Sequence, residues 1–145
     1  MAGRLTLWGA GELLASYFSK TKEPPENYYL ALIRQIAPTP FVSGAELDEP
    51  DGMGYARLRI PNNSVYWSNE SQPQVMLMVE NLSFQMATDN WGMIRYWALC
   101  NAEAEGFVYA TGSLETVQDV PEGEVVQLLG SDLAISIGPF YAEEN

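Results

Sequence analysis

Carboxylates are the side chains of this chain that could do chemistry, because histidine is absent and Cys100 is the single cysteine. This composition excludes a Ser-His-Asp or Cys-His arrangement, a disulfide within the chain and a cysteine zinc site. No glycine-rich phosphate loop with suitably spaced Lys or Ser/Thr occurs. Paired carboxylates remain, as in glycosidases, and Glu80 and Asp89 are the candidates because they flank an apolar strand. Nothing in the sequence brings these two together, so we expect no catalytic residue and no cofactor.

A second group of carboxylates falls in one loop and comprises Glu46, Asp48, Glu49 and Asp51. Calcium prefers hard oxygen ligands of this kind. The cluster lacks the regular spacing of an EF-hand loop, so the sequence favours an acidic surface loop. Asp48 and Asp51 are weak metal candidates.

The composition places limits on the class of protein. The chain has 145 residues, of which 47% are hydrophobic and 18% charged, which predicts one globular domain. Seven basic against nineteen acidic residues give a net charge of −12, which argues against nucleic-acid or anionic-membrane partners. No apolar stretch approaches the roughly 20 residues of a membrane span. No signal peptide is recognised, so we expect synthesis in a cytoplasm.

The apolar spacing predicts one helix and then a series of strands. A helix is expected over residues 7–20, ended by Pro24 and Pro25. Apolar runs, alternation and turn signals predict the strands: 28–36, 55–60, 65–67, 75–79, 82–87, 93–100, 107–111, 116–120, 125–129 and 133–137. We therefore expect a mainly β fold, a jelly-roll-like or Greek-key β-sandwich with an N-terminal helical arm. The expected division is an arm over 1–22, a sandwich over 23–138 and an acidic tail over 139–145.

Aromatic residues are abundant, with four Trp and eight Tyr. Trp67, Trp91, Tyr96 and Trp97 lie in or beside predicted strands, where core packing is the ordinary role and is expected for at least two of the Trp. A small sandwich has limited room for large rings, so some are expected at an oligomer interface or on a sugar-stacking platform.

An ordered series of short features extends over about residues 13–137. It includes Tyr29-Leu30-Ala31-Leu32, Gly54-Tyr55-Ala56-Arg57, Ala87-Thr88-Asp89-Asn90-Trp91-Gly92 and Pro121-Glu122-Gly123-Glu124. In this order the series resembles small phage virion proteins of the tail fibre or minor tail type, some of which look like capsid decoration proteins. The resemblance implies structure and assembly and not catalysis. Gly54, Tyr55, Arg57, Trp91 and Gly92 are then expected to maintain the fold, with Gly54 turning the loop sharply into a strand.

The sequence therefore predicts a non-enzymatic structural protein of a phage virion, made in the bacterial host cytoplasm. We expect a tail component, fibre or baseplate-proximal, that assembles as a homotrimer by analogy with other phage appendages and contacts other virion proteins. Two alternatives stay open: a capsid decoration protein, and a carbohydrate-binding module that reads a host surface glycan through exposed Trp67 or Trp97. The expected interface residues are Trp8, Leu13, Tyr17, Phe18, Trp67 and Trp97.

Overall fold

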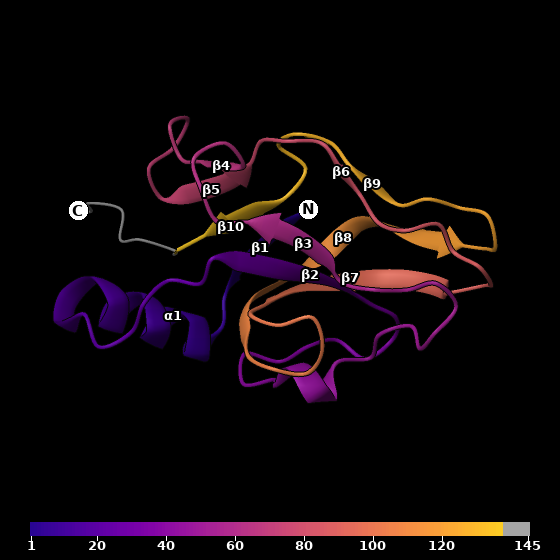
Figure 1. The fold of residues 1–145 in the computed structure, drawn as a ribbon, viewed down its shortest axis with the longest axis horizontal. Coiled ribbons are helices and arrows are strands. Elements are labelled where there is room, and N and C mark those ends of the chain that lie inside the picture. The colour runs from indigo at the N-terminus through magenta and orange to yellow at the C-terminus, as the bar shows by residue number, and fades with distance from the viewer. Residues whose placement is uncertain (138–145) are drawn as a thin grey trace, which may run out of the picture.

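The computed structural model describes residues 1–137, and strands dominate it (Figure 1). The elements, in chain order, are β1 (Ala2–Leu5), α1 (Leu7–Leu14), the π-helix η1 (Ala15–Ser19), β2 (Asn27–Ile33), the 3-10 turn η2 (Gly44–Glu46), β3 (Leu58–Pro61), β4 (Trp67–Ser68), β5 (Val75–Met78), β6 (Leu82–Ser83), β7 (Gly92–Cys100), β8 (Val108–Val120), β9 (Gln127–Leu128) and β10 (Ala134–Ser136). This confirms a mainly β fold. The predicted acidic tail lies outside the described residues.

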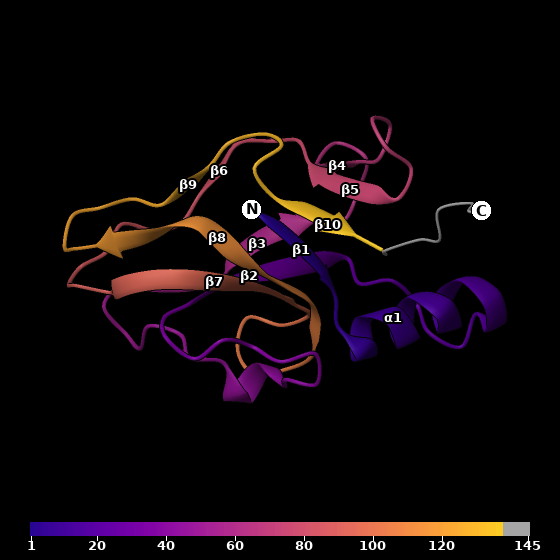
Figure 2. The same ribbon diagram turned by 180° about the vertical axis from the view of Figure 1, so that it is seen from behind.

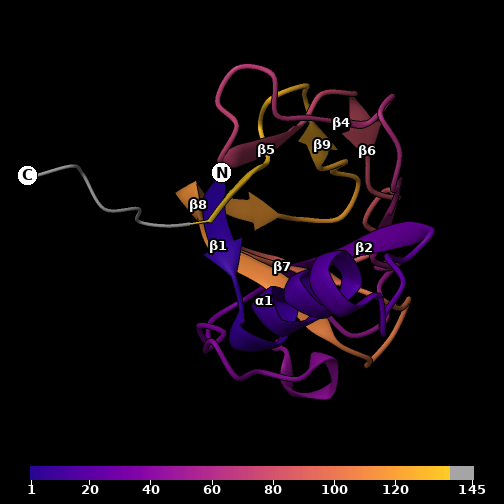
Figure 3. The ribbon, with the colours of Figure 1, turned by 90° about the vertical axis from the view of Figure 1, so that its left-hand side faces the viewer.

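Eight of these strands form one sheet, in the order β3-β2-β7-β8-β1-β10-β5-β4, and β6 pairs with β9. Neighbours are antiparallel except β1 and β10, which are parallel. The sheet curls, so that β4 and β5 lie across from β2 and β7 as in two layers (Figure 3). β7 and β8, the two longest strands, run side by side (Figure 2).

The central strands bury both of their faces. In β2, Leu30 and Leu32 join the main core, whereas Ala31 and Ile33 pack in a second, smaller cluster on the opposite face. The loop that follows β2 covers this second face, and its Val42 belongs to the smaller cluster. Burial on both faces explains why these strands read as continuous apolar runs instead of alternating ones.

The strands differ from the sequence-based prediction in several places: the predicted strand 82–87 is only β6, and three further differences concern how strands begin, join or insert. β1 was not predicted, and it lies between β8 and β10, so the first residues belong to the sheet and the helical arm begins only after them. The runs 107–111 and 116–120 form the single strand β8, whose register against β7 shifts between Ile94 and Tyr96. The predicted strand 55–60 pairs with β2 only from Leu58 onward. Arg57, directly before it, instead forms hydrogen bonds to the neighbouring loops.

The predicted helix over 7–20 is confirmed, in two parts. The first part, α1, is an α-helix that ends at Leu14. The π-helix η1 continues directly from it and ends at Ser19. Lys20 ends the segment in the left-handed conformation, at φ 56°. Neither this segment nor any other helix within residues 1–137 has the length and apolar character that a membrane crossing requires.

Candidate assembly surface

The start of α1 is anchored firmly on β8. The Thr6 hydroxyl accepts a hydrogen bond from the Gly9 N–H at 2.9 Å and donates one to the Val108 carbonyl at 2.6 Å. A Cβ on Gly9 would collide with the Tyr109 carbonyl, so this position requires glycine. The sequence marks Gly9 as a weak helix residue, whereas in the structure its missing side chain allows the helix to approach the sheet.

Beyond this anchor the arm is apolar and exposed. We use "arm" for residues 7–19, in which Glu12 is the one charged residue. Gly9 is the one buried residue of α1, and η1 has none. Tyr17 and Phe18 are each 76% exposed, and the other large apolar side chains of the arm are 45–56% exposed: Leu7, Trp8, Leu13 and Leu14. A helix that is apolar on all sides is normally buried, so this one has the composition of a covered element.

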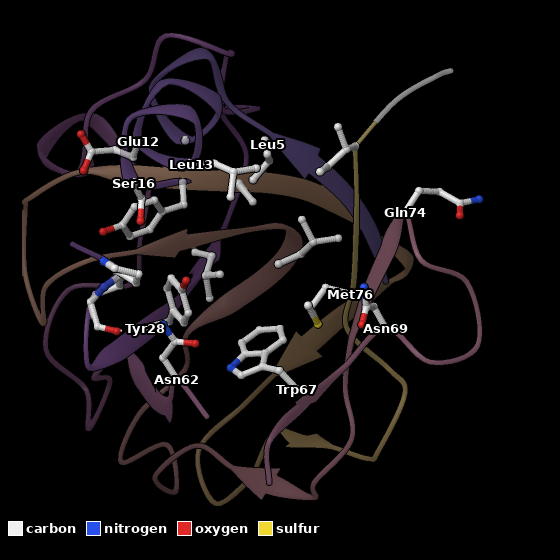
Figure 4. Close-up of a pocket in the computed structure, with 18 of the residues that line it drawn as sticks. Leu5, Glu12, Leu13, Ser16, Tyr28, Asn62, Trp67, Asn69, Gln74 and Met76 are labelled. Carbon is white, nitrogen blue, oxygen red and sulfur yellow. Dashed lines mark hydrogen bonds between the residues drawn. The ribbon is translucent and has the colours of Figure 1, made fainter. Parts of the chain in front are cut away.

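A pocket of about 320 Å³ separates the arm from the sheet (Figure 4). Leu13 and Ser16 close it from the helix side, and Tyr28, Trp67 and Met76 line it from the sheet. The rings of Tyr28 and Trp67 meet edge to face with centroids 5.6 Å apart. The pocket is therefore a mostly apolar space with an aromatic wall.

The tyrosines beneath the arm are uncharged near neutral pH. Burial raises the pKa of Tyr28, and burial together with the neighbouring Tyr28 and Glu12 raises the pKa of Tyr109 to about 12. Their rings meet edge to face at 5.4 Å. The floor of this region thus presents aromatic surface without a negative charge.

Trp67 and Trp97 are not the exposed platform that was expected. Trp97 is 0% exposed, and its indole N–H finds no acceptor within residues 1–137. Trp67 is 9% exposed and its indole N–H donates to the Pro61 carbonyl at 3.0 Å. The prediction of an exposed ring is wrong for both, because the core takes their large apolar surface. The prediction that at least two Trp pack in the core is confirmed, with Trp91 as the third.

The fold-motif residues come together around one buried cation. Arg57 donates to Glu49 Oε2 at 2.8 Å and, through Nη1, to the Ala102 and Glu105 carbonyls, each at 2.9 Å. Tyr55 donates to the same Glu49 and accepts the Leu32 N–H. We call this set the Arg57 clasp. It ties the acidic loop to the loop between β7 and β8.

The electrostatics of the clasp are those of a closed structural site. Burial acts to lower the pKa of Arg57, but the hydrogen bond and attraction of Glu49 outweigh it and raise the pKa. Burial first, and then Glu49, raises the pKa of Tyr55 above its ordinary value. Desolvation raises the pKa of the nearby Cys100 thiol to about 12, so this thiol is not a reactive nucleophile.

The other three fold-motif residues are Trp91, Gly54 and Gly92, and Trp91 packs directly against Tyr55 of the clasp. Trp91 donates its indole N–H to the Met53 carbonyl at 2.7 Å and meets Tyr55 edge to face at 5.3 Å. Gly54 adopts φ 78° where a Cβ would come within 2.8 Å of the Met86 carbonyl, and Gly92 adopts φ 88°. Two motifs far apart in sequence therefore form one packed unit.

The carboxylates singled out from the sequence lie in loops, and two of them accept hydrogen bonds from backbone N–H groups. Asp48 accepts the Gln35 and Ile36 N–H groups, and Asp89 accepts that of its neighbour Asn90. Asp51 and Glu80 are exposed in loops. Within residues 1–137 no three Cys, Asp or Glu side chains gather to hold a metal ion.

The sequence predicted the arm but not all of the exposed apolar residues that form its surface. It missed Leu7 and Leu14, although both belong to the same uncharged stretch as Trp8 and Leu13. It also missed Glu49 as the partner of Arg57. Glu49 was grouped with its acidic neighbours, and no local signal distinguishes it from them.

The described residues form a mainly β domain with an apolar core, one buried and paired cation, and an exposed apolar helix. Residues 5–136 match the family described as Podophage GP4 fiber I protein gp80, and the chain belongs to this family. The resemblance to phage tail fibre proteins is thereby confirmed, and the chain is a phage fibre-type structural protein of the virion. Among curated proteins, none matches the chain.

Proposed function

We propose that this protein is a non-enzymatic subunit of a phage tail, fibre or baseplate-proximal, that joins the particle through its N-terminal arm and associates with copies of itself. The observation that carries the proposal is the arm, which is apolar on all sides and exposed. The three aromatic rings of the arm alone expose roughly 400 Å², taking about 200 Å² per ring. The largest apolar patch of a typical monomer is about 300–600 Å² in total and is often functional.

The test is incorporation into particles by variants of the arm. Substituting Trp8→Ser together with Leu14→Ser removes two large exposed side chains of the arm and should reduce the chain recovered in purified virions at least tenfold. The reason is that interface energy concentrates in such anchors. The matched control is Met93→Ser with Val117→Ser, two exposed apolar residues on β7 and β8.

Mass spectrometry of purified virions measures the incorporation, and separating tails from capsids before the measurement locates the protein. Recovery with the tail fraction supports the proposal, and recovery with empty capsids would favour the decoration alternative. Normal incorporation of the arm variant, with its fold checked by circular dichroism, would refute attachment through the arm.

The glycan-binding alternative has less support. Both tryptophans expected to stack on sugars belong to the core, where Trp97 is 0% and Trp67 9% exposed. The exposed rings lie instead on the arm, in an apolar surrounding without the convergent polar groups that sugar recognition uses. A glycan array, with and without Ca²⁺, would restore this alternative if a defined sugar bound.

A further inference from the structure

The geometry points to a head-to-tail contact between copies, in which Tyr17 and Phe18 of one copy enter the pocket between arm and sheet of the next. We call these two side chains the aromatic knob. The inference rests on the proposed assembly role and names the partner as a second copy of this chain. It also names both halves of the contact, which the proposed role leaves open.

The knob is held ready for binding. Its rings meet edge to face at 5.3 Å and are each 76% exposed. The turn that carries them is closed by hydrogen bonds from Thr21 N–H and the Ser19 hydroxyl to the Ala15 carbonyl, each at 3.1 Å. A knob whose conformation is already set loses little entropy on binding.

The pocket suits an aromatic side chain. Its volume of about 320 Å³ is at the lower end of the range for ligand pockets, and most of its lining is apolar. Tyr28 and Trp67 form a wall that can extend edge-to-face packing to an entering ring (Figure 4). Met76 lines it as well, and methionine adapts its shape to aromatic neighbours.

The knob of a chain does not fill the pocket of the same chain. Gly9, Glu12, Leu13 and Ser16 are the arm residues that line the pocket, whereas neither knob residue lines it and both are exposed. Knob and pocket are therefore different surfaces of one molecule. A contact between different surfaces repeats from copy to copy and closes into a ring, of which a trimer is a small example, or grows into a filament.

The local charges beside the knob and in the pocket are complementary, which fits a second copy as the occupant. The chain carries −12, so two copies repel unless cations of one face acids of the other. Two of its seven basic residues, Lys20 and Lys22, directly follow the knob, and two acids, Glu12 and Glu23, line the pocket. Lys22 already lies 3.8 Å from Glu12 within one chain. A knob that enters the next pocket brings Lys20 toward acids of the same kind.

The experiment measures molar mass by light scattering for four full-length variants. The knob variant is Tyr17→Ser with Phe18→Ser, and the pocket variant is Met76→Lys. Phe41→Ser and Met93→Lys are the matched controls, because both residues are exposed and neither lines the pocket. Wild type and controls should have a multiple of the 16.1 kDa chain mass, and the knob and pocket variants should each have the mass of one chain.

Mixing the two defective variants separates this contact from a symmetric one. The intact knob of the pocket variant can enter the intact pocket of the knob variant, so an equimolar mixture should form a pair and nothing larger. A single-chain mass for wild type, an unchanged mass for the knob variant or a mixture without pairs would each overturn the inference. None of these outcomes bears on incorporation of the Trp8 and Leu14 variant, so attachment to the particle through the arm is tested separately.

Discussion

At the scale of single residues, the Arg57 side chain forms more hydrogen bonds than any other side chain within residues 1–137. Its side chain is 2% exposed and bonds to Glu49, Gly44, Ala102 and Glu105. These partners come from two loops that pack on one face of β2 and β7. Hydrogen bonds from one buried cation thus hold these two loops together. Burying this charge has a desolvation cost, which the hydrogen bonds offset.

Substituting Arg57→Met should lower the free energy of unfolding by about 3–5 kcal/mol, because it leaves the largely buried Glu49 carboxylate without its cation and three carbonyls without their donor. The control is Arg59→Met in β3, an exposed residue whose one side-chain hydrogen bond, to Asn27, is 3.3 Å long. Its effect should stay within about 0.5 kcal/mol. Urea denaturation followed by circular dichroism measures both. Equal effects of the two substitutions would show that the clasp contributes no stability.

At the scale of elements, glycines set how closely strands and rings approach. The Trp97 ring of β7 lies over Gly3 of β1 and Gly112 of β8, where any side chain would meet the indole. The aromatic ring thus spans three neighbouring strands at the centre of the sheet. The sequence shows glycines in strands, which ordinarily weaken them, and the structure shows the close approach that compensates for this.

Gly112→Ala should therefore destabilise the protein by about 1–3 kcal/mol, because the new Cβ would come within 2.6 Å of the Trp97 ring. Gly11→Ala makes the same chemical change on α1, where nothing lies within 4 Å, and should stabilise by about 1 kcal/mol. Thermal melting of both variants gives the comparison. Shifts of the same sign would contradict this account of how the sheet packs on Trp97.

At the scale of the whole molecule, three partly or largely buried tyrosines link stability to alkaline pH. Burial is the main cause that raises the pKa values of Tyr28, Tyr55 and Tyr109 above the ordinary value of 10.0. The unfolded chain therefore loses these protons at lower pH than the folded protein does. Their contribution to stability is complete below about pH 10 and falls as the pH rises further.

Tyr55→Phe tests this linkage, because Tyr55 is the most perturbed of the three. It should lower the free energy of unfolding by about 1–3 kcal/mol near neutral pH, since the Leu32 N–H loses its acceptor. Above about pH 10 it should also make the decline of stability shallower than in wild type. Tyr17→Phe, at an exposed position, should change neither quantity. Parallel declines for wild type and Tyr55→Phe would show that this hydroxyl does not titrate on unfolding.

Much of the fold could be predicted from local pattern. The helix over 7–20 and the strands around β2, β5 and β7 follow from apolar spacing, turn residues and prolines, which act within a few residues. β1 escaped prediction because its four residues alternate weakly, and its place between β8 and β10 depends on contacts more than a hundred residues away. The same distance separates Thr6 from the Val108 carbonyl that anchors the arm.

Some features of the candidate site could likewise be predicted from the sequence, and others depend on the fold. Composition predicts an apolar arm, because one charge in thirteen residues is visible without a fold. The exposure of a side chain cannot be seen in the sequence. The high number of aromatic residues therefore suggested that Trp67 and Trp97 lie at the surface, whereas both are buried in the core. The pocket depends on how far the arm stands from the sheet, which Gly9 and Thr6 decide by their contacts with β8.

The mainly β class, the resemblance to phage fibre proteins and the helical arm could all be inferred from the amino-acid sequence, because periodicity and ordered motifs are properties of neighbouring residues. Three further features became visible only in the folded chain: which tryptophans are buried, where the first strand inserts, and the pairing of Arg57 with Glu49. Those outcomes depend on long-range packing, in which each side chain competes for a limited interior, and on desolvation, which acts on a charge only after the chain has closed around it.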